Sequence, residues 1–119
     1  MKLAIIGSRN IENIDLDKYI KDKPEVIISG GAKGIDTIAW KWALENNIEI
    51  IVHRPEYNKY GKYAALKRND TIINEADKII AFWNGLSNGT KYVIDKTKEL
   101  NKPLEIIIIE NNYERKNGT

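Results

Sequence analysis

Residues 26–46 read VIISGGAKGIDTIAWKWALEN, and this stretch decides the fold. The segment Val26–Ser29 opens with three β-branched residues and shows no polar alternation, which is typical of a strand buried on both faces of a parallel sheet. A glycine-rich turn follows. From Ile35 to Asn46 apolar side chains recur at a spacing of three and four residues, which predicts a helix with one apolar stripe. A buried strand, a tight turn and a helix in this order indicate an α/β fold.

Other strands and helices follow the same logic along the chain. Further β-branched runs predict strands at Leu3–Ile6, Ile48–Val52, Lys78–Phe82 and Leu104–Ile109. Helices are expected over Leu16–Lys21 with Asp15 or Asn13 as the cap, over Gly61–Glu75, and over Gly89–Leu100, which Pro103 follows. Their expected buried positions are Ile72, Ile73 and Ala76, then Val93, Thr97 and Leu100.

The alternation of strand and helix predicts a single doubly wound α/β domain over residues 1–110. Its sheet is expected to have five mostly parallel strands in the order 3-2-1-4-5, with helices on both faces. The polar segment 111–119 is expected to be a frayed tail.

Composition excludes several classes of protein. The chain has 119 residues, which fits one domain, and no cysteine, so disulfide scaffolds, thiol catalysis and zinc–thiolate sites are ruled out. A net charge of +2 is too even for gripping nucleic acid by bulk charge, so nucleic acid is a disfavoured partner. No apolar run reaches the ~18 residues of a membrane span, and the apolar start is too short for a signal peptide. We therefore expect a cytoplasmic protein with no membrane partner, no metal site and no cofactor.

Small and polar residues gather where three predicted strands end. Gly7-Ser8-Arg9 follows the first strand, residues 29–36 follow the second, and residues 84–90 follow the fourth. In an open parallel sheet, ligands bind at the carboxyl ends of the strands where the strand order reverses. Glycines let backbone N–H groups approach an anion, and a helix start carries partial positive charge. Three such loops favour a phosphate or nucleotide, whereas any one alone is equally a tight turn. The motifs G-x-G-x-x-G and G-x-x-x-x-G-K-[ST] are absent, which disfavours ordinary NAD enzymes and P-loop NTPases.

Two charged residues outside this pattern have a structural and a functional interpretation each. Arg68 shares the sheet-facing side of its predicted helix with Ile72, so it either pairs with a carboxylate such as Asp70 or Asp95 or reaches a bound phosphate. Asp36 lies in the first turn of the helix over 35–46, so it either caps that helix or accepts a hydrogen bond from a ligand sugar or base.

The remaining aromatic residues also leave alternatives open. Trp83 either stacks on a base or closes the end of the core. Trp40 and Leu44 form a second apolar line on their helix, which we interpret as a homodimer surface. His53, the single histidine, has no partner motif around it and is interpreted as structural.

Five motifs in order resemble the SLOG superfamily of Rossmann-like ligand-binding domains, and most closely its YspA/YpsA-related branch. The resemblance covers about residues 3–109. It implies a Rossmann-like fold and a nucleotide-derived ligand, and it makes the last motif an aromatic-rich version of the superfamily's phosphate loop. The motifs are Gly7-Ser8-Arg9, Ser29-Gly30-Gly31-Ala32-x-Gly34-Ile35-Asp36, Pro55-x-Tyr57-x-x-Tyr60-Gly61-Lys62-x-Ala64 leading to Arg68-Asn69, Ala76-Asp77, and Phe82-Trp83-Asn84-Gly85-x-Ser87-x-Gly89-Thr90.

Two related groups bracket the function that the resemblance implies. The LOG phosphoribohydrolases cleave the N-glycosidic bond of a nucleoside monophosphate, and Arg68 matches an arginine of their pattern. They also have a Glu three residues after the Gly-Thr of the phosphate loop, where this chain has Val93. An enzyme would need Asp36 or Asp95 instead. The protein DprA has a similar second loop and binds single-stranded DNA, which this chain would contact through Arg9, Lys33, Lys62, Arg68 and Trp83.

We therefore expect a domain that binds a nucleotide or nucleotide-derived ligand, with a phosphoribohydrolase and a single-strand DNA binder as alternatives. If the protein is an enzyme, the expected catalytic residues are Arg68, Asp36 and Asp95. The expected ligand-binding residues are Gly7, Ser8, Arg9, Ser29, Gly30, Gly31, Gly34, Asp36, Arg68, Asn69, Trp83, Gly85, Ser87, Gly89 and Thr90.

Overall fold

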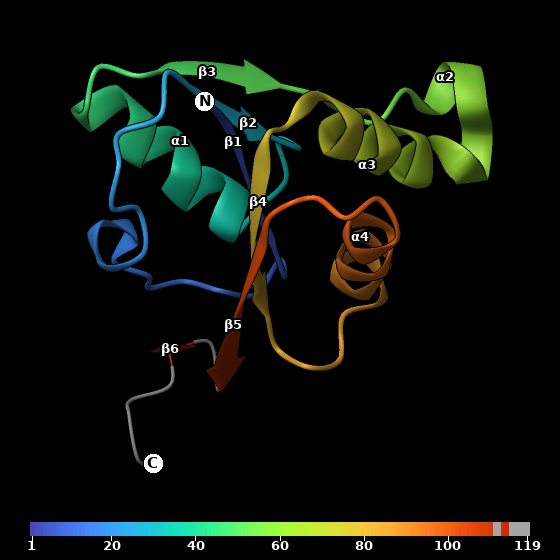
Figure 1. Cartoon of the computed structure of the whole chain (residues 1–119). Helices are drawn as coiled ribbons and strands as arrows, with labels where there is room; N and C mark the ends of the chain where they lie inside the picture. Colours follow the sequence, from blue (N-terminus) through green and yellow to red (C-terminus); the bar gives the residue numbers. More distant parts are fainter. Residues whose placement is uncertain (111–112, 115–119) are drawn as a thin grey trace.

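The sheet of the computed structural model, which describes residues 1–110 and 113–114, is built around its first strand (Figure 1). The strands lie in the order β3-β2-β1-β4-β5-β6. All neighbours from β3 to β5 are parallel, and β6 is antiparallel to β5. The predicted order of five parallel strands is confirmed. The strands are β1 (Lys2–Gly7), β2 (Val26–Ser29), β3 (Glu49–Val52), β4 (Lys78–Trp83), β5 (Leu104–Glu110) and β6 (Tyr113–Glu114).

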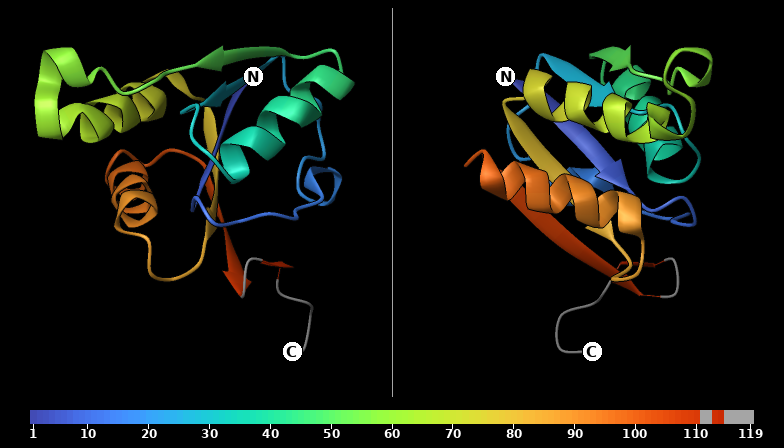
Figure 2. Two further views of the ribbon diagram at one scale, coloured as in Figure 1. Left: turned by 180° about the vertical axis from the view of Figure 1, so that it is seen from behind. Right: turned by 90° about the vertical axis from the view of Figure 1, so that its right-hand side faces the viewer.

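Helices cover both faces of this sheet. Helix α1 (Ile35–Glu45) lies on one face, and α3 (Ala64–Glu75) and α4 (Asn88–Glu99) lie on the other (Figures 1 and 2). The short helix α2 (Tyr57–Tyr60) and a 3₁₀ turn (Gly61–Tyr63) precede α3 at one end of the molecule. Because β1 is central and the chain crosses from β3 to β4, the strand order reverses between β1 and β4. The loops after these two strands therefore flank the place where open α/β sheets bind ligands.

Alternate residues of the central strands enter opposite cores. On the α1 side, Leu3 and Ile5 of β1 pack in one cluster with Ile35, Ala39 and Ala43 of the helix. On the other side, Ala4 and Ile6 pack in a second cluster with Ile72, Ile73 and Val93 of α3 and α4. Both faces of β1 are buried, which explains why its sequence is continuously apolar.

Two predicted helices have other bounds than expected. The segment Leu16–Lys21 forms only a 3₁₀ turn over Leu16–Lys18, capped by the carboxylate of Asp15, and Tyr19 then turns its ring edge-on to Phe82. The helix expected over 61–75 covers Ala64–Glu75, whereas Gly61–Tyr63 form a 3₁₀ turn that begins at Gly61, with a φ of 55°. The positive φ of Gly61 interrupts helical hydrogen bonding at that point.

One predicted core position is also wrong. Val93 and Thr97 are buried as expected, whereas Leu100 is 44% exposed. It lies at the C-cap of α4, where the helix ends, and Ile94 contributes the buried side chain instead. Of the predicted tail 111–119, only Tyr113 and Glu114 lie within the described residues, so the prediction that this segment frays stays untested.

Candidate functional site

The loops after β1, β2 and β4 meet α3 around one cavity of about 440 Å³. It opens at the carboxyl ends of the strands, beside the point where the strand order reverses. Ten of the predicted binding residues line it. These are Gly7, Ser8, Arg9, Gly30, Asp36, Arg68, Asn69, Ser87, Gly89 and Thr90.

The amino end of α4 forms one wall of this cavity. The hydroxyl of Ser87 accepts a hydrogen bond from the backbone N–H of Thr90 at 3.4 Å, which fixes the first turn of the helix. The first N–H groups of a helix have no carbonyl partner within it, so those of Asn88 and Gly89 are available to a ligand. A Cβ built on Gly89 would meet nothing within 4 Å, which shows open space above the helix start. This wall suits an anion.

Arg68 lines the same cavity from α3 and is held in place by two hydrogen bonds. Its Nη1 donates to the carbonyl oxygen of Gly30 at 2.7 Å, and its Nε donates to the Oδ1 of Asn69 at 2.8 Å. Arg68 is therefore not tied to Asp70 or Asp95, whose carboxylates accept from Tyr92 and Lys91. Two of its five N–H donors are used in these contacts, and the rest of the fork suits an anionic ligand.

The charges around Arg68 also favour an anion. Burial lowers the pKa of the Arg68 guanidinium from its usual value, attraction to Asp36 and Tyr57 raises the pKa, and repulsion by Arg9 lowers it again. Arg9 and Arg68 line the same cavity and repel each other across it. Asp36 is the one acid among the residues that line the cavity. A bound anion would therefore reduce the repulsion between the two guanidinium groups, which Asp36 alone does not neutralise.

Asp36 and Ser8 bring buried polar atoms to the cavity. The Oδ2 atom of Asp36 accepts from the backbone N–H of Ala32 at 2.8 Å. The N-cap of α1 is Gly34 and no side chain caps the helix, so this carboxylate does not act as its cap. Burial raises the pKa of Asp36. The hydrogen bond from Ala32, the positive charge of Arg68, the Ser29 side chain and the Gly30 backbone each lower this pKa, but by less than burial raises it. Asp36 Oδ1 and Ser8 Oγ are buried without a hydrogen-bond partner.

The first and second loops are held against each other at Gly34. This residue has a φ of 76°, and a Cβ built on it would lie 2.8 Å from the carbonyl oxygen of Ser8 and closer still to that of Arg9. A side chain would therefore push the two loops apart. Gly34 does not line the cavity; it allows the loop that carries Asp36 to pack against the loop that carries Ser8.

Five other predicted residues also lie outside the cavity. Ser29 and Gly31 line a smaller neighbouring pocket beside Trp40. Gly85 lies in the loop after β4 with open space around it. The indole Nε1 of Trp83 donates to the carbonyl of Ser87 at 3.0 Å and so supports the loop. Asp95 is exposed and paired with Lys91 at 2.9 Å.

Sequence reasoning missed other residues that line the cavity. Asn84 shapes the loop after β4, because its Oδ1 accepts from the N–H groups of Leu86 and Ser87. Its position two residues after the predicted strand Lys78–Phe82, within the quoted motif, could have identified it. Val93 is buried and lines the cavity one turn after Thr90, where the phosphoribohydrolase pattern has a glutamate. The missed lining residues are Ile6, Asn10, Ala32, Ala65, Asn84 and Val93.

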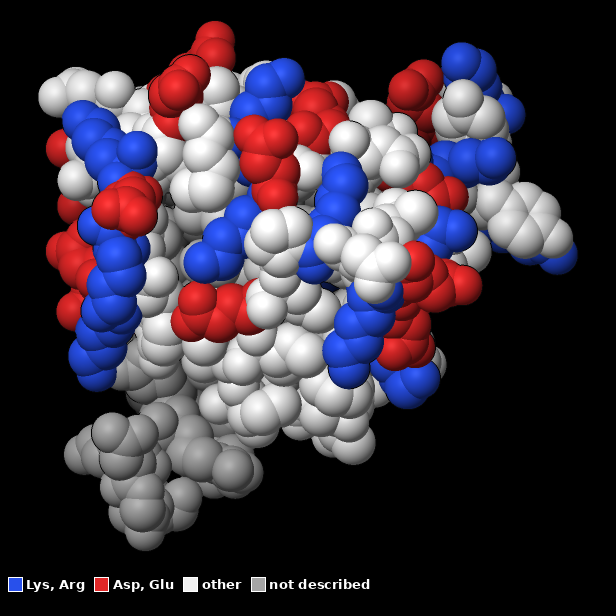
Figure 3. Space-filling view, in the orientation of Figure 1, with Lys and Arg blue, Asp and Glu red and all other residues white. Residues whose placement is uncertain are grey.

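The charged surface around these elements is mixed. In Figure 3, lysines and arginines alternate with aspartates and glutamates over the face shown.

Within the described residues, no three His, Cys, Asp or Glu side chains gather in a way that could hold a metal ion. No helix of the described part of the chain is long and apolar enough to cross a membrane.

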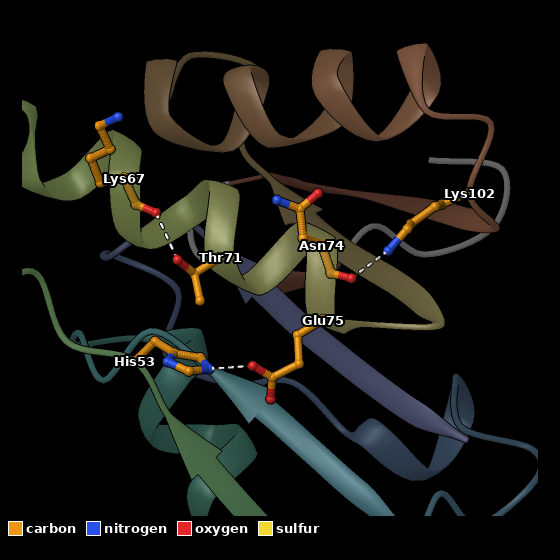
Figure 4. A network of polar contacts seen from close by, with 6 residues as sticks. All are labelled: His53, Lys67, Thr71, Asn74, Glu75 and Lys102. Atoms are coloured by element: carbon orange, nitrogen blue, oxygen red, sulfur yellow. Dashed lines mark hydrogen bonds and ion pairs between the residues drawn. The ribbon is translucent and has the colours of Figure 1, made fainter.

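His53 and the pair Trp40 and Leu44 lie away from the main cavity. The Nε2 atom of His53 lies 2.9 Å from Oε2 of Glu75 (Figure 4). This contact joins the end of β3 to α3 and agrees with the structural interpretation of His53.

Trp40 and Leu44 are 47% and 55% exposed on α1. Pairing of two chains through them stays a prediction, which sedimentation of the wild type and a Trp40→Ser/Leu44→Ser variant would test.

Comparisons with known proteins agree with this architecture. A sequence model of the YspA, cpYpsA-related SLOG family matches residues 1–60, which contain the loops after β1 and β2. The chain is also similar to the Gene 61 protein of Mycobacterium phage D29, with 32% identity over 85 residues, 66% of this chain and 68% of that protein. No solved structure matches the chain. The half-chain match and this similarity show that the chain belongs to the YspA, cpYpsA-related SLOG family.

Proposed function

We propose that residues 1–110 form a cytoplasmic nucleotide-ligand-binding domain whose ligand places a phosphate at the amino end of α4. The observation that carries the proposal is the meeting of this helix start with two guanidinium groups, Arg9 and Arg68, in one cavity. The hydroxyls of Ser87 and Thr90 and the N–H of Gly89 would contact the phosphate. Arg68 would approach it from α3.

A cavity of about 440 Å³ is within the range of small-molecule sites and is larger than one phosphate requires. The lining also includes Asn10, Asn69 and Ala65, which offer amide groups and an apolar surface to the rest of a nucleotide. Such a mixture suits a ligand that is anionic at one end and less polar at the other.

The test is titration of the purified chain with nucleoside mono-, di- and cyclic phosphates by calorimetry, with mass spectrometry of the bound species. The variant Thr90→Ala/Arg68→Ala removes contacts from two walls and should weaken binding at least tenfold. Thr71→Ala/Lys91→Ala is the matched control, because it removes the same kinds of group from exposed positions on α3 and α4. Wild-type affinity in the first variant for every nucleotide bound would overturn the phosphate placement.

A second candidate is a nucleoside monophosphate phosphoribohydrolase, which one observation favours. Asp36 is a buried acid in the cavity with a raised pKa, as general acids and bases often are. It would stabilise the positive charge that develops on the sugar or activate water. Release of free base and ribose 5-phosphate would establish this activity, and retention of intact nucleotide at high protein concentration would exclude it for the nucleotides tested.

A further inference from the structure

Two buried polar atoms on different loops lack partners and line the same cavity. Ser8 is 3% exposed and Asp36 is 7% exposed, and both Ser8 Oγ and Asp36 Oδ1 are without a hydrogen bond. Buried polar groups are nearly always hydrogen-bonded, because an unsatisfied one costs free energy. Two such atoms at one cavity indicate groups that a ligand completes.

The chemistry of the two atoms specifies that ligand group. An ionised carboxylate only accepts hydrogen bonds, and the other oxygen of Asp36 already accepts from Ala32. Asp36 Oδ1 therefore needs a donor. The Ser8 hydroxyl donates and accepts, and its partner can be the same kind of group. A ligand hydroxyl fits both atoms, since it donates to the carboxylate and accepts from the serine.

The surroundings exclude the anionic part of the ligand from this position. A phosphate oxygen beside the Asp36 carboxylate would be repelled, whereas Arg68 and the start of α4 attract it. The ligand is thus divided between a phosphate subsite at α4 and Arg68 and a donor subsite at Asp36 and Ser8. A sugar bearing free hydroxyls next to a phosphate has this arrangement.

We propose that Asp36 and Ser8 form a sugar-hydroxyl subsite, which makes the preferred ligand a ribonucleotide rather than a 2′-deoxyribonucleotide. This inference rests on the proposed function, because the phosphate at α4 orients the sugar. It deepens that function by separating the ligand class from DNA and its precursors. It also assigns specificity to two residues that do not contact the phosphate.

The experiment is a double-mutant cycle in which the ligand hydroxyl and the Asp36 carboxylate are the two groups removed. The probes are the four ribonucleoside 5′-monophosphates and their 2′-deoxy counterparts, titrated into the wild type, Asp36→Asn and Ser8→Ala. Hydrogen bonds to charged groups contribute enough for a preference of about 10- to 100-fold, so we expect the wild type to favour the ribose form by that factor. In Asp36→Asn the preference should fall to about threefold or less, with affinity for the 2′-deoxy form nearly unchanged.

Four results separate this inference from the proposal on which it rests. Thr90→Ala should weaken ribose and deoxyribose forms equally, which tests the phosphate subsite alone. Equal wild-type affinity for both forms, with Thr90 still required, would overturn the hydroxyl subsite and leave the phosphate site standing. Equal weakening of both forms by Asp36→Asn would also overturn it, because a merely structural role has that effect. No binding of any of these probes, together with no binding of the di- and cyclic phosphates, would overturn both proposals.

Two features keep the variants interpretable. Asparagine has the shape of aspartate and retains an oxygen for the Ala32 N–H, so the loop after β2 keeps its hydrogen bond. Ser8→Ala removes a buried hydroxyl that has no partner in the chain, so it leaves no new unsatisfied group. A fall in the ribose preference with Ser8→Ala is the second, independent readout, and an unchanged preference in both variants would contradict the proposal.

Discussion

Nη1 of Arg68 on α3 donates to the carbonyl oxygen of Gly30 at 2.7 Å, a contact between residues 38 positions apart in the sequence. This hydrogen bond fixes the distance between the loop after β2 and the third helix. It also orients the guanidinium toward the cavity that both segments line. The absence of a side chain at residue 30 is what allows the approach, since a Cβ there would lie 2.6 Å from the same nitrogen.

Gly30→Ala should therefore displace Arg68 without unfolding the protein. The added methyl group meets the flexible end of a side chain, so we expect a loss of stability within about 1 kcal/mol. The displaced guanidinium should weaken phosphate binding by roughly tenfold, or about 1.4 kcal/mol. Calorimetric titration and urea unfolding measure the two effects. Unchanged affinity would show that Arg68 does not contact the ligand from its present position.

Gly89→Ala should affect stability and binding in opposite directions. Residue 89 is in the first turn of α4, and the new methyl group has no atom within 4 Å. Alanine favours a helix over glycine by roughly 0.5–1 kcal/mol in a helix interior, so the variant should unfold at slightly higher urea concentration. The methyl group would occupy the space proposed for the phosphate and weaken binding at least tenfold. A variant that is stabilised and binds normally would exclude the phosphate from this position.

Asp36→Asn should reveal the cost of burying the carboxylate through its pH dependence. Burial raises the pKa of Asp36 in the folded protein, so the folded state holds its proton more tightly than the unfolded chain. The contribution of this group to stability is then greatest below about pH 4, the ordinary pKa of aspartate, and falls as the pH rises through the raised folded pKa. Asparagine has no charge to bury.

The variant should accordingly be more stable than the wild type at pH 7, with a difference that shrinks toward pH 4. Loss of attraction to Arg68 offsets part of this gain. Urea unfolding of both proteins between pH 4 and pH 8 measures the difference. A gain that is the same at every pH, or a loss at pH 7, would contradict the direction of the pKa shift.

Lys102 should be a large contributor to stability outside the site. Its Nζ donates to the carbonyl oxygens of Ile73, Asn74 and Ala76 at 2.6, 3.0 and 2.8 Å, which satisfies the carboxyl end of α3. Figure 4 shows the contact with Asn74. Lys102→Met keeps the length of the side chain and removes the three donors, so we expect a loss of about 1–3 kcal/mol in the free energy of unfolding. Lys98→Met, at an exposed position of α4, is the control and should stay within about 0.5 kcal/mol. Equal effects of the two variants would contradict the assignment.

Much of this architecture follows from local pattern. The stripe of Ile35, Ala39 and Ala43 predicts which face of α1 is buried, because helical periodicity depends only on neighbours three or four residues apart. The helix predicted over residues 61–75 begins three residues late, at Ala64, because the backbone of Gly61 takes a positive φ, which a side-chain pattern does not report. Leu100 fits the periodic pattern of α4 but lies where the helix has already ended.

The sequence by itself determined the five parallel strands, their order and the three loops that meet at one edge, because continuous apolar runs require burial on both faces and the order of elements restricts how they connect. Only the tertiary structure decided which polar groups find partners. The sequence left open whether Arg68 pairs with a carboxylate or reaches a bound phosphate, and the structure shows it donating to Gly30 and Asn69. Ser8 and Asp36 are left with unpaired atoms at the same cavity. Hydrogen bonding depends on distances and angles between segments that are remote in the chain, and these exist only once the layers have packed.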